Sequence, residues 1–224
     1  MDFFKIIQSL EELLYEMMTW LVFYPRTLWR ACTHPIDLLH YSDRELRDSP
    51  DQQFLELLSP PLFLLLTILL SHLIEVAMNQ QLPTATTEFG QAILTSDQNL
   101  LILRALMFSI YPLLFAVTRL HTQHIPLNRE TLREPFFAQC YIAGPAALVL
   151  GVASILMRVP GNVPLLAGVA LALLSVVWYL WVEVVWFRLR LGLSTFAAIR
   201  PTVFTWLAAA FLNYLVSFLV IGLR

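Results

Sequence analysis

The chain has 224 residues, of which 58% are hydrophobic and 13% are charged, and its mean hydropathy is +0.68. Soluble globular proteins contain about 25% charged residues, so this composition excludes an ordinary soluble domain and indicates an integral membrane protein. The formal net charge is only −2, and the basic residues are too scattered along the chain for a nucleic-acid partner.

The first 24 residues predict an amphipathic helix over residues 2–24. Its apolar residues recur at intervals of three and four, which is the spacing of one helix face, whereas the glutamates lie off that face. An apolar stripe of this kind must be covered by the membrane interface, by the rest of the protein or by a second copy. We therefore expect an assembly helix whose stripe contains Ile6, Leu10, Leu13, Met17 and Trp20. Pro25 marks its predicted end.

Residues 1–59 form the predicted cytoplasmic or interfacial segment, in which the part after residue 30 is polar and holds only short helices. A membrane domain is expected over residues 60–224. Its first span is predicted at about 61–78, where eighteen residues contain no lysine, arginine or aspartate. At about 1.5 Å rise per residue, this helix spans roughly 27 Å, close to the hydrocarbon thickness of a bilayer.

Four more apolar runs predict further spans at about 100–120, 136–157, 163–187 and 202–223. The predicted fold class is therefore all-α: a polytopic membrane bundle of five transmembrane helices preceded by the amphipathic helix. Pro112 is expected to kink the second span, and Gly144-Pro145 to break the third.

The basic residues predict the orientation of these spans. Eleven of the 14 face one side if the N-terminus is cytoplasmic, whereas Arg158 and Arg224 face the other and Arg104 lies in the second span. Because positively charged loops stay in the cytoplasm, we expect the N-terminus inside and the C-terminus outside.

Two charged residues lie inside the predicted spans. Because a charged side chain in the hydrocarbon is unfavourable, such residues indicate a functional or structural role. Glu75 and Arg104 lie at similar depth near the outer end of antiparallel spans, so we predict that they form an ion pair. His72, one turn from Glu75, could join them. The pair and His72 form either a ligand or gating site or a structural lock between two helices.

Two further polar residues are embedded in the spans. Glu183 lies near the cytoplasmic end of the fourth span and is expected to pair with Arg119 or with the arginines at 188 and 190. Asn213, in the middle of the fifth span, is expected to join two helices by hydrogen bonding.

The sequence contains no nucleotide-binding, hydrolase or metalloprotease motif. We therefore expect no enzyme activity, no cofactor and no metal.

Four stretches resemble the Yip1-domain family. They are THPIDLL at 33–39, SPPLFLLL at 59–66, QCYIAGPAALVL at 139–150 and RLRLGLSTFAAIR at 188–200. The resemblance covers roughly residues 26–224 and implies five spans behind a cytoplasmic segment. Eukaryotic members of the family look like trafficking and membrane-shaping factors, and prokaryotic members are often described as permeases. The resemblance implies a prokaryotic member in the bacterial inner membrane.

Two functions remain open at this point. The first is a non-catalytic membrane scaffold or accessory subunit that self-associates or binds a membrane or cytoplasmic protein partner through its N-terminal segment. The alternative is a transporter or permease for lipids or polyisoprenoids, with a polar site between the first two spans. A cleft beside Glu75 and Arg104 that is open to lipid or water favours the alternative; a closed bundle with the amphipathic helix at a subunit contact favours the scaffold.

Overall fold

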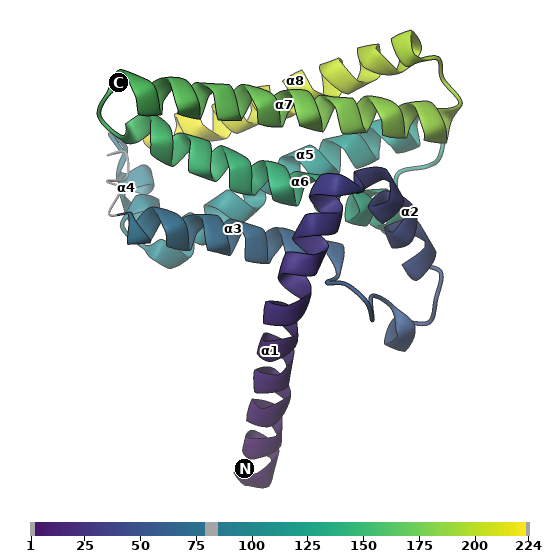
Figure 1. Ribbon diagram of the computed structural model, residues 1–224, viewed down its shortest axis with the longest axis horizontal. Helices are drawn as coiled ribbons and strands as arrows, with labels where there is room; N and C mark the ends of the chain where they lie inside the picture. The colour runs from purple at the N-terminus through teal and green to yellow at the C-terminus, as the bar shows by residue number, and fades with distance from the viewer. Residues whose placement is uncertain (1–2, 79–84, 223–224) are drawn as a thin grey trace.

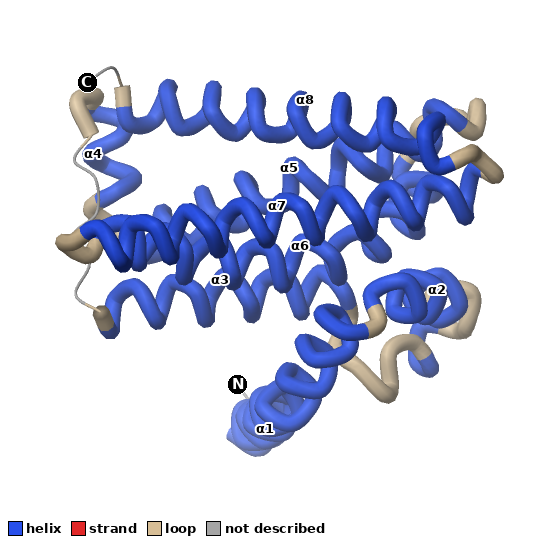
Figure 2. The backbone as a smooth tube through the Cα atoms, turned by 45° about the horizontal axis from the view of Figure 1, so that its top comes forward, coloured by secondary structure: helices blue, strands red, loops and turns tan. Residues whose placement is uncertain are grey.

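The computed structural model describes residues 3–78 and 85–222, and these residues form helices and connecting loops without any strand (Figure 1, Figure 2). This confirms the predicted all-α fold. The elements are α1 Phe3–Thr33, α2 Pro35–Glu45, a 3₁₀ turn at Pro50–Gln52, α3 Pro60–Ala77, α4 Glu88–Leu94, α5 Asp97–Thr122, α6 Arg129–Arg158, α7 Asn162–Leu191 and α8 Thr195–Ile221.

Five of these helices, α3 and α5 to α8, are long and apolar enough to cross a membrane, as predicted. They lie side by side with their axes roughly aligned (Figure 1). We call the end where α3 and α6 stop and α5 and α7 begin the distal end, and the end beside α2 the proximal end. Helices α5, α6 and α8 begin before the predicted apolar spans, and a polar side chain caps the first turn of each: Ser96, Asn128 and Ser194.

Helix α6 occupies the centre of the bundle and packs against α3, α5 and α7. Small residues make this position possible: a Cβ added at Gly144 would lie 2.4 Å from the ring of Phe63 on α3. The expected break at Gly144-Pro145 is wrong, since α6 continues through Pro145 to Arg158. Neighbouring helices enclose this stretch, and such packing allows a membrane helix to tolerate the hydrogen bond that proline removes.

Helix α1 leaves the bundle at a steep angle to the spans (Figure 1). It does not end at Pro25 as predicted but continues to Thr33. The turns after Pro25 are held by packing, because Thr27 is fully buried and its hydroxyl donates to the carbonyl of Phe23 at 2.7 Å. One turn earlier, the hydroxyl of Tyr24 lies 3.2 Å from that of Thr67 on α3.

The segment between α1 and α3 also packs on the bundle. Leu38 and Leu39 of α2 are fully buried, and α2 lies against α6 and α7. Close to the start of α3, the hydroxyl of Tyr141 donates to the carbonyl of Leu58 at 2.6 Å. Short helix α4 lies between α3 and α5, and residues 79–84, which follow α3, are outside the described residues.

Candidate ligand site at the distal end of the bundle

Glu75 is the centre of a charged cluster at the distal end. It sits in the last turn of α3, and its side chain is 5% exposed. One carboxylate oxygen accepts from Arg104 of α5 and the other from Arg158 of α6. The predicted Glu75–Arg104 ion pair is therefore present, and a second arginine completes it from a third helix.

The topology of the bundle explains this convergence. Helix α3 ends where α5 begins, so Glu75 and Arg104 come to the same depth, as the sequence indicated. Arg158 comes from the end of α6, which packs against α3 although it is not its neighbour in the sequence. Arg158 was predicted on the outer side of the membrane, just beyond the third span, and its contact with Glu75 depends on the packing of α6 against α3, which hydropathy does not predict.

His72 extends the cluster by one turn of α3. It is 5% exposed, and its Nδ1 lies 3.3 Å from a guanidinium nitrogen of Arg104. Its Nε2 lies 4.0 Å from a carboxylate oxygen of Asp97 at the start of α5. The three residues predicted as a ligand or gating site, His72, Glu75 and Arg104, are thus brought together.

A cavity of about 180 Å³ lies beside this cluster, between α3, α5 and α6. One wall is polar and carries Glu75, Arg104 and Arg158, together with two serines. The apolar wall lies deeper on the same three helices and consists of Ile68, Phe108 and Leu150. The side chains of Arg104 and Arg158 are 21% and 30% exposed, so a ligand can reach both guanidinium groups.

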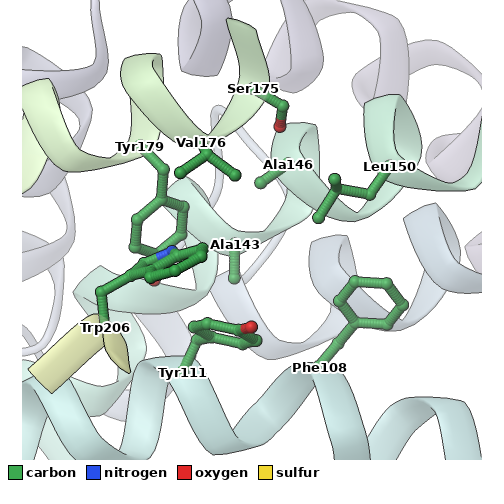
Figure 3. A pocket seen from close by; sticks show the side chains of 9 residues that line it. All are labelled: Phe108, Tyr111, Ala143, Ala146, Leu150, Ser175, Val176, Tyr179 and Trp206. Atoms are coloured by element: carbon green, nitrogen blue, oxygen red, sulfur yellow. The ribbon is translucent and has the colours of Figure 1, made fainter. Parts of the chain in front are cut away.

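A smaller cavity of about 30 Å³ continues deeper into the bundle, between α5, α6, α7 and α8. It shares Phe108 and Leu150 with the distal cavity. Figure 3 shows Ser175 and Tyr179 of α7 at its wall, with Tyr111 of α5 on the opposite side. We call it the inner cavity.

No family model, no curated protein and no solved structure matches this chain.

The expected partners of Glu183 are wrong. Glu183 is fully buried and accepts a hydrogen bond from the amide of Gln139 on α6 at 3.1 Å. Arg119 instead binds Glu134 at 3.1 Å, and Arg190 binds Asp43 of α2. Neither contact has a local sequence signal: α2 brings Asp43 to the proximal end of α7, and Gln139 of α6 faces Glu183, only through the packing of the helices.

Asn213 also differs from the prediction. Its amide donates to the carbonyl of Ala209 at 3.1 Å, one turn back in α8, rather than to another helix. It satisfies a backbone carbonyl locally, which is a common arrangement for polar side chains in helices.

The residues predicted as the assembly stripe lie on the free part of α1. Leu10, Leu13 and Met17 are about half exposed, at 55%, 51% and 48%. Trp20 is half-buried and packs against the residues around Phe63, whereas the side chain of Ile6 is outside the described part of the structure. Among the described residues, no group of three or more metal-binding side chains gathers at any point.

Proposed function

We propose that this membrane protein is a permease for lipids or related amphiphiles, and that its ligand has an anionic headgroup. The observation that carries this proposal is the distal cavity, which joins two partly exposed arginines to an apolar wall inside the bundle.

The polar wall suits an anionic headgroup. A guanidinium group has five N–H donors in a planar fork, which matches the oxygens of a phosphate or carboxylate. Arg104 uses its donors on Glu75 and faces His72, and it keeps donors for a ligand. Glu75 holds Arg104 and Arg158 on either side of one carboxylate, so the two arginines are positioned before the ligand arrives.

The apolar wall suits a hydrocarbon chain. Ile68, Phe108 and Leu150 lie one to two helical turns deeper in the bundle than the ion cluster, on the same three helices as the charged residues. A headgroup at the arginines would therefore leave its chains in the membrane rather than in water.

The cavity also argues against a purely structural lock. Protein interiors are close-packed. If the ion pair served only to hold two helices together, side chains packed into the adjacent space would make the bundle more stable. Ionisable residues within membrane spans commonly mark substrate pathways. Here space of about 180 Å³ remains beside the charges.

Lipid binding by the purified protein tests the proposal. Native mass spectrometry would compare bound phosphatidylglycerol with bound phosphatidylcholine in wild type, Arg104→Gln and Arg158→Gln. Loss of one charge-assisted hydrogen bond is worth about 1.5–3 kcal/mol, so each variant should bind phosphatidylglycerol at least about tenfold more weakly. Arg129→Gln, at an exposed position at the proximal start of α6, is the matched control. Equal retention by all four proteins would refute the proposal.

The proposal includes the membrane orientation of the protein and its relation to the Yip1-domain family. With the N-terminus in the cytoplasm, as the excess of basic residues on that side favours, the distal cavity opens in the outer leaflet. The resemblance to the Yip1-domain family, whose prokaryotic members are often described as permeases, supports this reading, and we propose the bacterial inner membrane as the location.

The scaffold function is kept as a second candidate because of α1. Met17 and Trp20 of the apolar stripe, with the neighbouring Leu14 and Met18, line an open cleft of about 500 Å³ whose other side carries leucines of α3 such as Leu70. A second copy of the chain or a membrane protein partner that filled this cleft would make α1 an assembly element.

A further inference from the structure

Glu183 and Gln139 form an isolated polar pair in the core of the bundle. Glu183 is fully buried and Gln139 is 2% exposed. Among the described residues, no cationic side chain comes within ion-pair distance of Glu183. In the described part of the chain, the only hydrogen-bond partner of Glu183 is the amide nitrogen of Gln139.

The pair leaves two oxygen atoms unused. The amide nitrogen of Gln139 donates to Oε2 of Glu183 at 3.1 Å, while Oε1 of Glu183 and Oε1 of Gln139 have no partner in the described structure. Both orphaned atoms are acceptors, so they cannot satisfy one another without a hydrogen. Buried acceptors without partners are destabilising, and an isolated carboxylate in a membrane span is more so.

We propose that Glu183 is a proton-binding site. A proton from water forms an O–H bond at Oε1 of Glu183, and this group then donates to Oε1 of Gln139. The amide nitrogen of Gln139 already donates to Oε2, so acid and amide close a ring of two hydrogen bonds without net charge. One proton satisfies both orphaned oxygens.

Among the described residues, none supplies a charge to Glu183 in place of the proton. Two arginines near this part of α7 are paired elsewhere, since Arg119 binds Glu134 and Arg190 binds Asp43. The other ionisable groups that face this part of α7 are Tyr179 on α7 itself, Tyr111 on α5, Cys140 on α6 and His40 on α2, and α8 contributes the indole of Trp206.

A route for the proton is visible on the same face of α7. Ser175, Tyr179 and Glu183 follow one another at intervals of four residues, which places them along one side of the helix. The hydroxyls of Ser175 and Tyr179 have no partner in the described structure, and both residues line the inner cavity (Figure 3). That cavity has room for about one or two waters and adjoins the distal cavity at Phe108 and Leu150.

Infrared spectroscopy of the purified protein in lipid tests this proposal without any ligand or transport assay. A protonated carboxyl absorbs at higher frequency than the amide groups, and this absorption disappears when the proton leaves. The spectrum of wild type at neutral pH minus that of Glu183→Gln should show one carboxylic-acid band. Glu75→Gln is the matched control and should remove no such band, because Glu75 faces two guanidinium groups.

Glu183→Gln should fold, since two amides can form the same ring of hydrogen bonds. Gln139→Leu offers a second measurement, in which the acid band stays but shifts in frequency because its amide partner is gone. A wild-type spectrum without the band, or a band that survives in Glu183→Gln, would overturn the proposal. Neither result depends on lipid binding at the distal cavity, so the two proposals fail separately.

Discussion

Replacing Glu75 by glutamine separates a ligand site from a structural lock. The side chain keeps its shape but loses the charge that Arg104 and Arg158 share. A hydrogen bond to a charged group contributes about 1.5–3 kcal/mol, and the 21% and 30% exposure of the two arginines reduces this by screening. We expect a net loss of about 2–3 kcal/mol. For a chain of this size that corresponds to a melting temperature lower by roughly 5–10 °C.

The change in melting temperature on adding lipid distinguishes a ligand site from a structural lock. Thermal unfolding in an uncharged detergent would be followed with and without added phosphatidylglycerol. In wild type, Glu75 positions the arginines but its charge also competes with the headgroup for them. In Glu75→Gln the amide oxygen can still accept from an arginine, while the competing charge is gone. We therefore expect the anionic lipid to raise the melting temperature of the variant more than that of wild type. A ligand at 100 times its Kd stabilises by about 2.7 kcal/mol, enough to restore most of the loss.

Glu130→Gln is the control, because it removes one negative charge at an exposed position in the first turn of α6, far from the distal end. It should leave both the melting temperature and the lipid response unchanged. If phosphatidylglycerol stabilises wild type and Glu75→Gln to the same extent, the arginines are not a headgroup site and the cluster is only a lock between three helices.

Three further predictions concern the proximal end and α1. Leu13→Glu should dissociate any oligomer, measured by light scattering, because it places a charge in the apolar stripe, whereas Tyr15→Glu on the exposed side should not; identical masses for both would exclude the stripe as the contact. Asp43→Asn should lower stability by about 2–3 kcal/mol in thermal unfolding because it leaves the partly buried Arg190 without its counter-charge, and an unchanged melting temperature would contradict the pairing. Partial burial, with the nearby Arg190 as a second cause, lowers the pKa of His40 below its ordinary value of 6.5, so the folded state resists a proton that the unfolded state accepts. Stability should therefore be full above pH 6.5 and fall as the pH drops below it, and a melting-temperature profile of His40→Gln should be flatter; equal slopes would contradict the assignment.

The sequence predicted what depends on hydropathy and depth. Apolar runs gave the five spans, since a membrane helix needs a length that the bilayer sets. Antiparallel neighbours in sequence gave the Glu75–Arg104 pair, because two residues at equal distance from a shared turn reach the same depth. Neither the spans nor this ion pair depends on contacts between helices that are distant in the sequence.

The missed features all depend on contacts between segments far apart in the sequence. Arg158 joins Glu75 because α6 packs against α3, and Asp43 reaches Arg190 because α2 folds back on α7. Pro25 does not end α1, since one face of the turns after it, with Thr27 and Ala31, is buried in the bundle. Local propensity favours a helix end at proline, but burial of the following turns outweighs it.

Leu150→Trp tests whether the ligand of the distal cavity is an amphiphile or a soluble anion. Leu150 lies on the apolar wall, so a larger ring there fills the space below the arginines without touching a charge. Binding of phosphatidylglycerol should weaken strongly, whereas stabilisation by glycerol phosphate, which has the headgroup chemistry but no chains, should persist. Leu148→Trp on the same helix, outside the cavity lining, is the control. If phosphatidylglycerol binds Leu150→Trp as well as it binds wild type, the chains do not use this wall, and the cavity recognises the anion alone.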